Sequence, residues 1–241
     1  MSTPDLTFLI EYYASAQGET TRTRLCGHIQ YFINSGKEET CVGIGYCIPY
    51  INDERAFSSC WHFLPGELYR QKDILPEKGS VIDSAQFPVR KDSTNRILVI
   101  HGLEYIRDPY LFLQNIWNLL VPMGRVLLIV PNRMGLWARL TSTPFGYGTP
   151  FSLAQLEQLL QESQFHLLHA RPALFMPPVT RRQGLRSSAL WRIITRWLLR
   201  PVGGVWIVEA EKRLYAEIPE TETEKSGLPL PVRPAFSREY P

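Results

Sequence analysis

Two apolar periods alternate along the chain and predict an α/β fold. Apolar residues recur at helical spacing through residues 6–34, in one stripe around Leu6 and Tyr13 and another around Leu25 and Ile33. Farther along, short apolar runs of strand length alternate with segments of helical spacing, an order typical of a parallel sheet with helices on its faces. The predicted strands cover residues 39–44, 56–63, 80–82, 97–100, 125–130, 166–175 and 204–210.

The clearest β-α-β unit begins with the strand at residues 97–100. Asp108 and Pro109 then open a helix, because proline suits the first helical turn. The sequence Pro122-Met123-Gly124 is expected to end that helix and to lead into the strand at 125–130. Ligands of open α/β sheets bind outside the carboxyl ends of the strands, so the residues that follow these two strands are candidates for function.

Three segments of this region carry a family resemblance. His101-Gly102-Leu103-Glu104 after a strand and the turn Leu120–Arg125 before the next strand resemble segments of the class I S-adenosylmethionine-dependent methyltransferases, type 11 group. Residues 152–165 resemble the helix that follows the fifth strand there. Within residues 131–152, PNRMGLWAR and TPFGYGTPFS resemble a divergent bacterial branch. Over residues 38–215 the resemblance implies a Rossmann-like seven-stranded methyltransferase sheet flanked by helices, with S-adenosyl-L-methionine as cofactor.

The resemblance divides the chain into three parts. Residues 1–37 are expected to form an N-terminal helical extension packed on the core, and residues 38–216 a methyltransferase-like domain. Residues 217–241 are expected to be a disordered tail, because their composition shifts to Pro, Glu, Thr and Ser.

The expected cofactor turn follows the first strand. The family pattern places an acid and three glycines at alternate positions; here Gly43 stands for the acid and Gly45 keeps the first glycine, whereas Cys47 and Pro49 replace the others. Small residues let a backbone approach a ligand closely, but proline fixes φ and removes an N–H. The resemblance implies that Gly43, Gly45, Tyr46 and Cys47 bind the cofactor. The alternative is a tight strand-to-helix turn without a ligand.

Two acids complete the expected cofactor site. Asp83 opens a segment that resembles the Asp-x-x-x-Leu-Pro segment of the family, which implies that its carboxylate accepts a hydrogen bond from the adenine amino group. Alternatively, Asp83 caps the following turn. The family also places a ribose-binding acid after the second strand, but residues 55–66 contain no Asp or Glu, so Glu67 is the nearest candidate.

His101 is the candidate catalytic residue, because family members line the methyl-transfer pocket at this position. Histidine side chains titrate near neutral pH and can serve as general bases. In the alternative interpretation, His101 binds loop backbone and Glu104 caps a turn. Methyl displacement often needs only proximity and orientation of the reactants, so a base is not obligatory.

The segment after the fifth predicted strand is rich in arginine and aromatic residues. Arginine can form paired hydrogen bonds with a carboxylate or phosphate, and aromatic rings can stack on a flat substrate. The candidate substrate-binding residues are Asn132, Arg133, Trp137, Arg139 and Tyr147. The alternative is a buried loop whose aromatic side chains cover the sheet edge and whose arginines bind backbone carbonyls.

A basic amphipathic helix is predicted from Gly184 to Leu199. Its basic face carries Arg192 and Arg196, with Arg200 just beyond. Such a helix can bind a membrane surface. The favoured alternative is an ordinary surface helix, because the strand that follows needs an apolar cover. The sequence contains no nucleic-acid-binding motif, so nucleic acid is not an expected partner.

Composition adds few constraints. The 241 residues fit one α/β domain with a short appendage, and the net charge is only +3. No apolar run reaches the length of a membrane span, and the N-terminus lacks the basic start of a signal peptide. The four cysteines lack metal-ligand spacing, so we expect reduced thiols, no metal and a cytoplasmic location.

These observations support two functional hypotheses. The first is an S-adenosylmethionine-dependent methyltransferase that acts on a small molecule by direct methyl displacement. The second is a catalytically inactive methyltransferase-like protein with a binding or regulatory role. The second is suggested by the missing acid at Gly43 and by Pro49 in the glycine turn.

Overall fold

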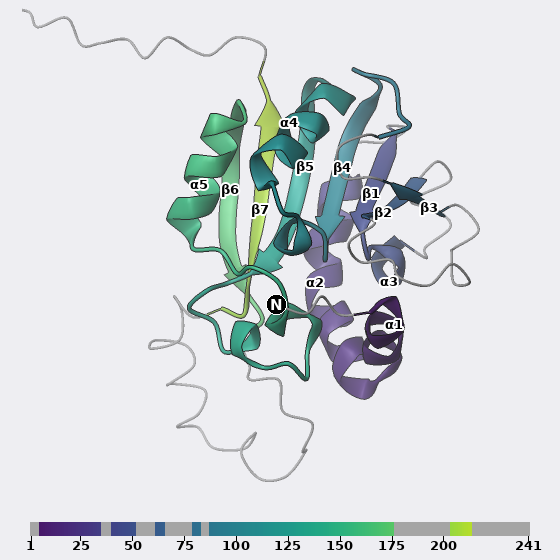
Figure 1. Ribbon diagram of the computed structural model, residues 1–241, viewed down its shortest axis with the longest axis vertical. Helices are drawn as coiled ribbons and strands as arrows, with labels where there is room; N and C mark the ends of the chain where they lie inside the picture. The colour runs from purple at the N-terminus through teal and green to yellow at the C-terminus, as the bar shows by residue number, and fades with distance from the viewer. Residues whose placement is uncertain are drawn as a thin grey trace, which may run out of the picture.

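The computed structural model describes residues 5–34, 40–51, 61–65, 79–82, 87–175 and 203–213. A mixed sheet lies at the centre of this structure, with helices on both of its faces (Figure 1). The strand order is β3-β2-β1-β4-β5-β7-β6. The strands are β1 (Cys41–Gly45), β2 (Trp61–Pro65), β3 (Gly79–Ile82), β4 (Thr94–Ile100), β5 (Leu120–Pro131), β6 (Phe165–Ala173) and β7 (Val205–Lys212).

The helices fall into two groups by the sheet face that they cover. They are α1 (Leu6–Ala14), α2 (Ala16–Asn34), the one-turn α3 (Ile48–Ile51), α4 (Pro109–Leu119) and α5 (Leu153–Glu162). Three short 3-10 helices complete the set: η1 (Leu103–Tyr105), η2 (Trp137–Arg139) and η3 (Pro144–Gly146). In Figure 1, α4 and α5 lie in front of the sheet and α2 lies behind it. The prediction of an α/β fold flanked by helices is confirmed.

Strand direction determines which loops meet. The strands from β3 to β5 run parallel to their neighbours, whereas β7 is antiparallel to both β5 and β6. Val205, at the start of β7, therefore pairs with Pro131 and with Ala173, at the ends of β5 and β6. The segments that leave β5 and β6 consequently lie beside the segment that enters β7.

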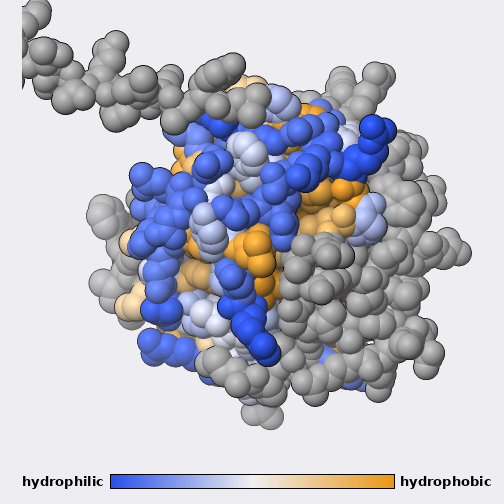
Figure 2. Space-filling model, turned by 45° about the horizontal axis from the view of Figure 1, so that its top comes forward, coloured by the Kyte–Doolittle hydropathy of each residue, from blue (hydrophilic) through white to orange (hydrophobic). Residues whose placement is uncertain are grey.

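Alternation of side chains along the strands divides the core in two. Leu98 and Ile100 of β4 pack into the cluster that includes residues of α1 and α2. Ile97 and Val99 face the other way, into the cluster with α4 and α5. Successive side chains of an extended strand point to opposite faces of the sheet, which explains this alternation. Because both faces are buried, the strands are continuous apolar runs in the sequence. Among the described residues on the face that Figure 2 shows, hydrophilic areas predominate, with smaller hydrophobic areas between them.

The front helices begin where the sequence predicts. The Asp108 side chain accepts a hydrogen bond from the backbone N–H of Leu111 at 3.0 Å, and Pro109 occupies the first turn of α4. Ser152 and Gln155 form a reciprocal capping box at the start of α5. Local capping chemistry therefore determines both helix starts.

The end of α4 corrects one sequence prediction. The helix ends at Leu119, and β5 begins at the next residue. The expected turn at Pro122–Gly124 therefore lies within β5, where Met123 has a φ of 64°. Leu120 pairs with Thr94, and the next pairing joins Arg125 to Arg96, so the residues between them form an irregularity that has no counterpart on β4. The predicted turn is therefore kept as this irregularity, and regular pairing resumes at Arg125, where the strand was expected to begin.

The N-terminal helical region is two helices rather than one continuous segment. Ser15 adopts an extended conformation between α1 and α2, and its hydroxyl accepts a hydrogen bond from the N–H of Gly18 at 3.1 Å. Leu9 and Ile29 are fully buried in the cluster that contains Leu98 of the sheet. The two helices thus share a core with the sheet.

Some predictions fall on residues outside the described ranges. These are the two acids Asp83 and Glu67, the helix over 184–199 and the tail over 217–241. Across the residues that the structure does describe, none of the helices combines the length and the apolar character that crossing a membrane requires.

Candidate functional site

The carboxyl ends of β1 and β4 form the centre of the candidate site. Gly45 pairs with Ile100, so the turn after β1 and the loop after β4 lie side by side. Gly45 has a φ of 83°, and a Cβ at this position would lie 2.2 Å from the carbonyl oxygen of Ile100. Only glycine fits such a conformation at such a distance. The first glycine of the predicted turn is therefore required by the neighbouring strand itself.

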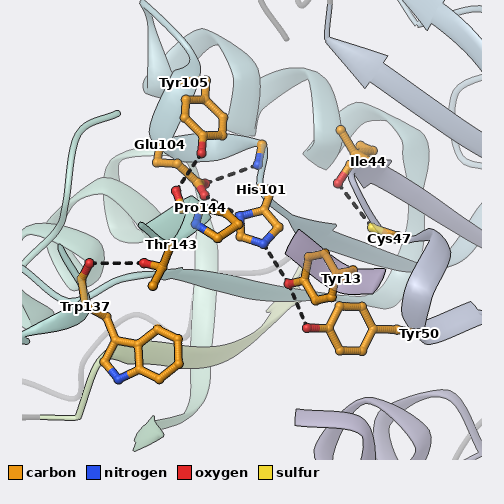
Figure 3. Close-up of polar contacts among 11 residues, drawn as sticks. Tyr13, Ile44, Cys47, Tyr50, His101, Glu104, Tyr105, Trp137, Thr143 and Pro144 are labelled. Carbon is orange, nitrogen blue, oxygen red and sulfur yellow. Dashed lines mark hydrogen bonds and ion pairs between the residues drawn. The ribbon is translucent and has the colours of Figure 1, made fainter. Parts of the chain in front are cut away.

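The two replaced glycines do not obstruct the turn. Cys47 is fully buried, and its thiol donates to the carbonyl oxygen of Ile44 at 3.3 Å (Figure 3). Pro49 lies in the first turn of α3, where a missing N–H costs no helical hydrogen bond. The Cys47 side chain therefore points into the protein, and Pro49 is compatible with the start of α3.

Gly43 and Tyr46 occupy different environments on either side of Gly45. Gly43 lies within β1, paired with His62 on one side and with Leu98 on the other. Tyr46 follows the strand and is buried, and this burial raises the pKa of its hydroxyl to about 12. The structure thus brings Gly43, Tyr46 and Cys47 together at one strand end.

His101 is completely buried at the start of the loop after β4. Its Nε2 lies 2.8 Å from the hydroxyl of Tyr13 in α1, and its Nδ1 lies 3.3 Å from Oε1 of Glu104 (Figure 3). The ring of Phe145 also packs against it, with centroids 4.6 Å apart. Both ring nitrogens of His101 therefore have partners within the protein.

The contacts of His101 belong to a longer buried chain. The hydroxyl of Tyr13 lies 2.9 Å from that of Tyr50 in α3, and Oε2 of Glu104 accepts a hydrogen bond from the N–H of Gly102 at 3.1 Å. In the tautomer with its proton on Nδ1, His101 donates to Glu104 and accepts from Tyr13 at Nε2. We call Tyr50, Tyr13, His101 and Glu104 the buried polar chain.

Burial keeps the tyrosines of the buried polar chain protonated. It raises the pKa of Tyr13 well above 10, and the neighbouring Tyr50 adds to this shift. Burial likewise raises the pKa of Tyr50 above its ordinary value, although the hydrogen bond with Tyr13 opposes the rise. Both hydroxyls are neutral hydrogen-bond donors near pH 7, since ionised phenolates would lose their hydration.

Asn132 ties the segment after β5 to the start of β7. Its side-chain amide donates to the carbonyl oxygen of Gly203 at 2.7 Å, and its side-chain oxygen accepts from the N–H of Met134 at 3.1 Å. The side chain is buried. These contacts position the loop, and they satisfy both ends of the Asn132 amide.

Trp137 and Tyr147 pack their rings into the protein. Trp137 is buried, with its ring 5.8 Å from that of Phe145, and it covers Gly204 so closely that a Cβ there would lie 2.2 Å from the indole. Tyr147 is half-buried and contacts the ring of Phe8 in α1 edge-on at 5.5 Å. The loop aromatics thus cover the sheet edge, as one of the two sequence interpretations expected.

Arg133 and Arg139 are exposed. Nε of Arg133 approaches the carbonyl oxygen of Pro150 at 3.4 Å, a long contact that leaves the rest of the guanidinium in solvent. The predicted substrate residues therefore separate into three that pack or position the loop and two that face solvent. No three His, Cys, Asp or Glu side chains within the described ranges are arranged to hold a metal ion.

Sequence reasoning missed Tyr13, Tyr50 and Phe145. Tyr13 lies in an apolar helical stripe and Phe145 lies in the loop, so each fits an ordinary core residue in the sequence. Their convergence on His101 depends on how α1, α3 and η3 pack. No local pattern signals it.

The sheet order, with its antiparallel β7 and its glycine turn at the end of β1, defines a Rossmann-like methyltransferase fold. The chain superposes on a Thermotoga maritima S-adenosylmethionine-dependent methyltransferase, described as a possible histamine N-methyltransferase, with a TM-score of 0.61 and 12% identity over 86% of this chain and 96% of that one. An Archaeoglobus fulgidus S-adenosylmethionine-dependent methyltransferase gives a TM-score of 0.59 and 16% identity, covering 86% of this chain and 100% of the other.

A third neighbour was solved with ligands. Geranyl diphosphate C-methyltransferase from Streptomyces coelicolor, in complex with Mg²⁺, geranyl diphosphate and S-adenosyl-L-homocysteine, gives a TM-score of 0.51 and 13% identity over 78% of each chain. At these identities the likeness establishes the fold.

The family follows from the sequence match. The methyltransferase domain model matches residues 25–170, more than half of the chain. The chain therefore belongs to the methyltransferase domain family. A search of curated proteins found no match.

Proposed function

We propose that this protein is an S-adenosylmethionine-dependent methyltransferase that transfers a methyl group to a small molecule by direct displacement. S-adenosyl-L-methionine is the cofactor, and it supplies the electrophilic methyl group. The observation that carries the proposal is the turn at Gly45. Its left-handed glycine is pressed against the end of β4, and its Cys47 side chain is turned inward, in a chain of the methyltransferase domain family.

The cofactor would lie against the backbone after β1. Gly43 and Gly45 keep the end of the strand compact. The main chain at Tyr46 and Cys47 would then form the surface that faces the ligand. Asp83 is assigned to the adenine amino group through its resemblance to the family segment. In this arrangement the protein binds and orients, and displacement needs little further chemistry.

His101 remains the candidate base, and the two hydrogen bonds to its ring fix the ring's orientation. A base must reach the proton that it removes, whereas His101 is completely buried, with Tyr13 and Phe145 packed against its ring. This closure favours the second candidate function, a methyltransferase-like binding or regulatory protein without catalysis.

Exposed arginines suggest the chemistry of the substrate. Arg133 and Arg139 are the members of the predicted substrate set that face solvent. A guanidinium pairs best with a carboxylate or phosphate. The proposed substrate is therefore an anionic small molecule, with Asn132, Trp137 and Tyr147 holding the loop that presents the two arginines.

Calorimetric titration of S-adenosylmethionine and S-adenosylhomocysteine into the full chain tests this proposal. We expect micromolar binding, weakened roughly 10- to 150-fold by Asp83→Ala, since a lost hydrogen bond to a charged group costs roughly 1.5–3 kcal/mol. Glu157→Ala, an exposed acid on α5, is the control and should leave binding unchanged. Absence of binding at millimolar ligand would reject the transferase and favour the binding protein.

A further inference from the structure

Exposed apolar side chains concentrate at one part of the sheet edge. Of the eight large hydrophobic residues that are exposed in the described part of the chain, four belong to the segments that follow β5 and β6. Met134 is 62% exposed, and Leu136 and Leu140 are 45% and 41% exposed. Phe175, just after β6, is the fourth. Scattered exposed apolar residues need no explanation, but a cluster often marks a binding surface.

These residues lie on segments that touch. The N–H of Gly204 donates to the carbonyl oxygen of Leu174 at 3.1 Å, which places the residues after β6 beside the start of β7. Trp137 packs directly over Gly204, and a Cβ on Gly135 would lie 2.7 Å from the carbonyl oxygen of Gly203. The loop after β5 and the residues around Phe175 therefore adjoin. We define the edge surface as Arg133, Met134, Leu136, Arg139, Leu140 and Phe175.

In the sequence, the segments that follow β5 and β6 carry charge of one sign, and Arg133 and Arg139 of the edge surface are exposed. Residues 131–151 contain two arginines and no acidic residue, and residues 170–204 contain seven arginines and no acidic residue. The whole chain has a net charge of only +3, so the rest of it is net negative. Such segregation of positive charge indicates an anionic partner.

We propose that the edge surface docks on an anionic membrane surface. Exposed apolar side chains flanked by arginines match the interface of a bilayer: apolar groups enter the headgroup boundary and guanidinium groups bind lipid phosphates. Single-stranded nucleic acid would instead favour several exposed aromatic rings as stacking platforms, whereas Phe175 is the one aromatic residue of the edge surface and Met134, Leu136 and Leu140 have no ring. This inference does not depend on the proposed function.

The docking would have a consequence for the candidate site. The loop that carries Arg133 and Arg139 also packs against His101 through Phe145. Docking would therefore bring this edge of the sheet toward the lipid headgroups, where anionic amphiphiles are concentrated.

Co-sedimentation of the full chain with lipid vesicles tests the proposal. One set of vesicles is pure phosphatidylcholine and the other is an equal mixture of phosphatidylcholine and phosphatidylglycerol. We expect binding to the anionic vesicles alone, weakening as salt is raised, because screening shortens the range of surface charges. Failure of the unmodified protein to bind anionic vesicles at low salt would overturn the proposal without any variant.

Paired substitutions locate the binding surface. Arg133→Glu with Arg139→Glu should lower vesicle partitioning roughly 30-fold or more, since each basic residue near an anionic surface is worth about fivefold. Leu136→Ser with Leu140→Ser should lower it by about tenfold or more through lost apolar burial. The control is Arg90→Glu with Lys91→Glu, which makes the same change in net charge on exposed residues of the turn before β4. It should lower vesicle binding far less than the Arg133→Glu and Arg139→Glu pair does.

The pattern across variants decides the outcome. Unchanged vesicle binding by both edge-surface pairs would overturn the assignment, even if the protein binds membranes through another segment. Binding of single-stranded RNA that Arg133→Glu with Arg139→Glu abolishes, without vesicle binding, would also overturn it. Because the substituted side chains are exposed, the thermal unfolding midpoint should stay near that of the unmodified protein, and this measurement accompanies each variant.

Discussion

Two neighbouring parts of one sheet edge differ in how they treat polar groups. At the ends of β1 and β4, the buried polar chain is closed by α1 and every named member has a partner inside the protein. At the end of β5, Arg133 and Arg139 extend into solvent beside exposed aliphatic side chains. The first part has its polar groups bonded inside the protein, whereas the second leaves charged and apolar groups in solvent.

Helix α1 accounts for much of this difference. Tyr13 of α1 reaches His101, and Phe8 of the same helix reaches Tyr147 at the far side of the loop. Where α1 covers the edge, the side chains are buried and contact other protein groups instead of water. Beyond its reach, the loop keeps its charged and apolar side chains exposed. Substitutions in the two parts should therefore differ in their cost to stability.

The largest effect is expected at the turn that joins β1 to β4. Gly45→Ala should lower the free energy of unfolding by about 4 kcal/mol, through the left-handed φ of 83° and the clash with the carbonyl oxygen of Ile100. Chemical denaturation measures the change. Gly27→Ala in α2 is the matched control: nothing lies near its added Cβ, so it should stabilise by roughly 0.5–1 kcal/mol. Similar effects at both positions would contradict this account of Gly45.

A smaller but still large effect is expected at Trp137. Trp137→Ala should lower the free energy of unfolding by about 3 kcal/mol, because the indole is buried between Phe145 and Gly204. Arg139→Ala, two residues away and exposed, should change it by less than about 0.5 kcal/mol. Denaturant titration of both variants compares a packed position with an open one in the same loop. Equal costs would remove that distinction.

The buried polar chain should be sensitive to loss of one hydroxyl. Tyr13→Phe keeps the ring but leaves Nε2 of His101 and the hydroxyl of Tyr50 without this partner, at a cost of about 1–3 kcal/mol. Tyr31→Phe, at a position 73% exposed, makes the same chemical change in solvent and should cost almost nothing. Equilibrium unfolding provides the comparison, and a neutral Tyr13→Phe would show that the chain is not a stabilising unit.

Tyrosine ionisation is expected to have the smallest effect on the free energy of unfolding at moderate pH. The effect grows as the pH rises above about 10. Folding raises the pKa of Tyr13, Tyr50 and Tyr46, to about 12 for Tyr46. Their contribution is complete below the unfolded value near 10 and is lost as pH rises from there toward the folded values. Each such tyrosine adds about 1.4 kcal/mol per pH unit to the decline.

Tyr13→Phe should therefore flatten the decline of stability above pH 10, because one of these ionisations is removed. Unfolding free energies measured from pH 8 upward would show the difference in slope, with Tyr31→Phe as the reference. Identical slopes in the two variants would mean that Tyr13 titrates in the folded protein as it does in solvent.

Local sequence signals predicted the elements that depend on local physics. Apolar runs located β1 and β4, and capping chemistry located the starts of α4 and α5. The same reasoning located the turn at Pro122–Gly124 and the regular pairing that resumes at Arg125, but it missed the pairing of Leu120 with Thr94 ahead of the turn. That pairing depends on a residue of another strand, which no local signal indicates.

The sequence predicted where the candidate site lies better than it predicted the contacts that its residues make. Gly45 and His101 follow strands, so the sequence places them at the carboxyl edge. The sequence left open whether Trp137 packs into the protein, and it did not indicate that Asn132 ties the loop to the start of β7. Each of these roles depends on a partner far away along the chain.

The sequence by itself determined an α/β chain of the methyltransferase type, with a glycine turn after its first strand and arginines after its fifth. Periodicity, caps and short motifs act between residues a few positions apart, and they can therefore be read directly from the order of residues. Only the tertiary structure decided that Tyr13, 88 positions from His101, closes the site, and that Arg133 and Arg139 stay open. Burial and hydrogen bonding between distant residues follow from how the helices pack on the sheet.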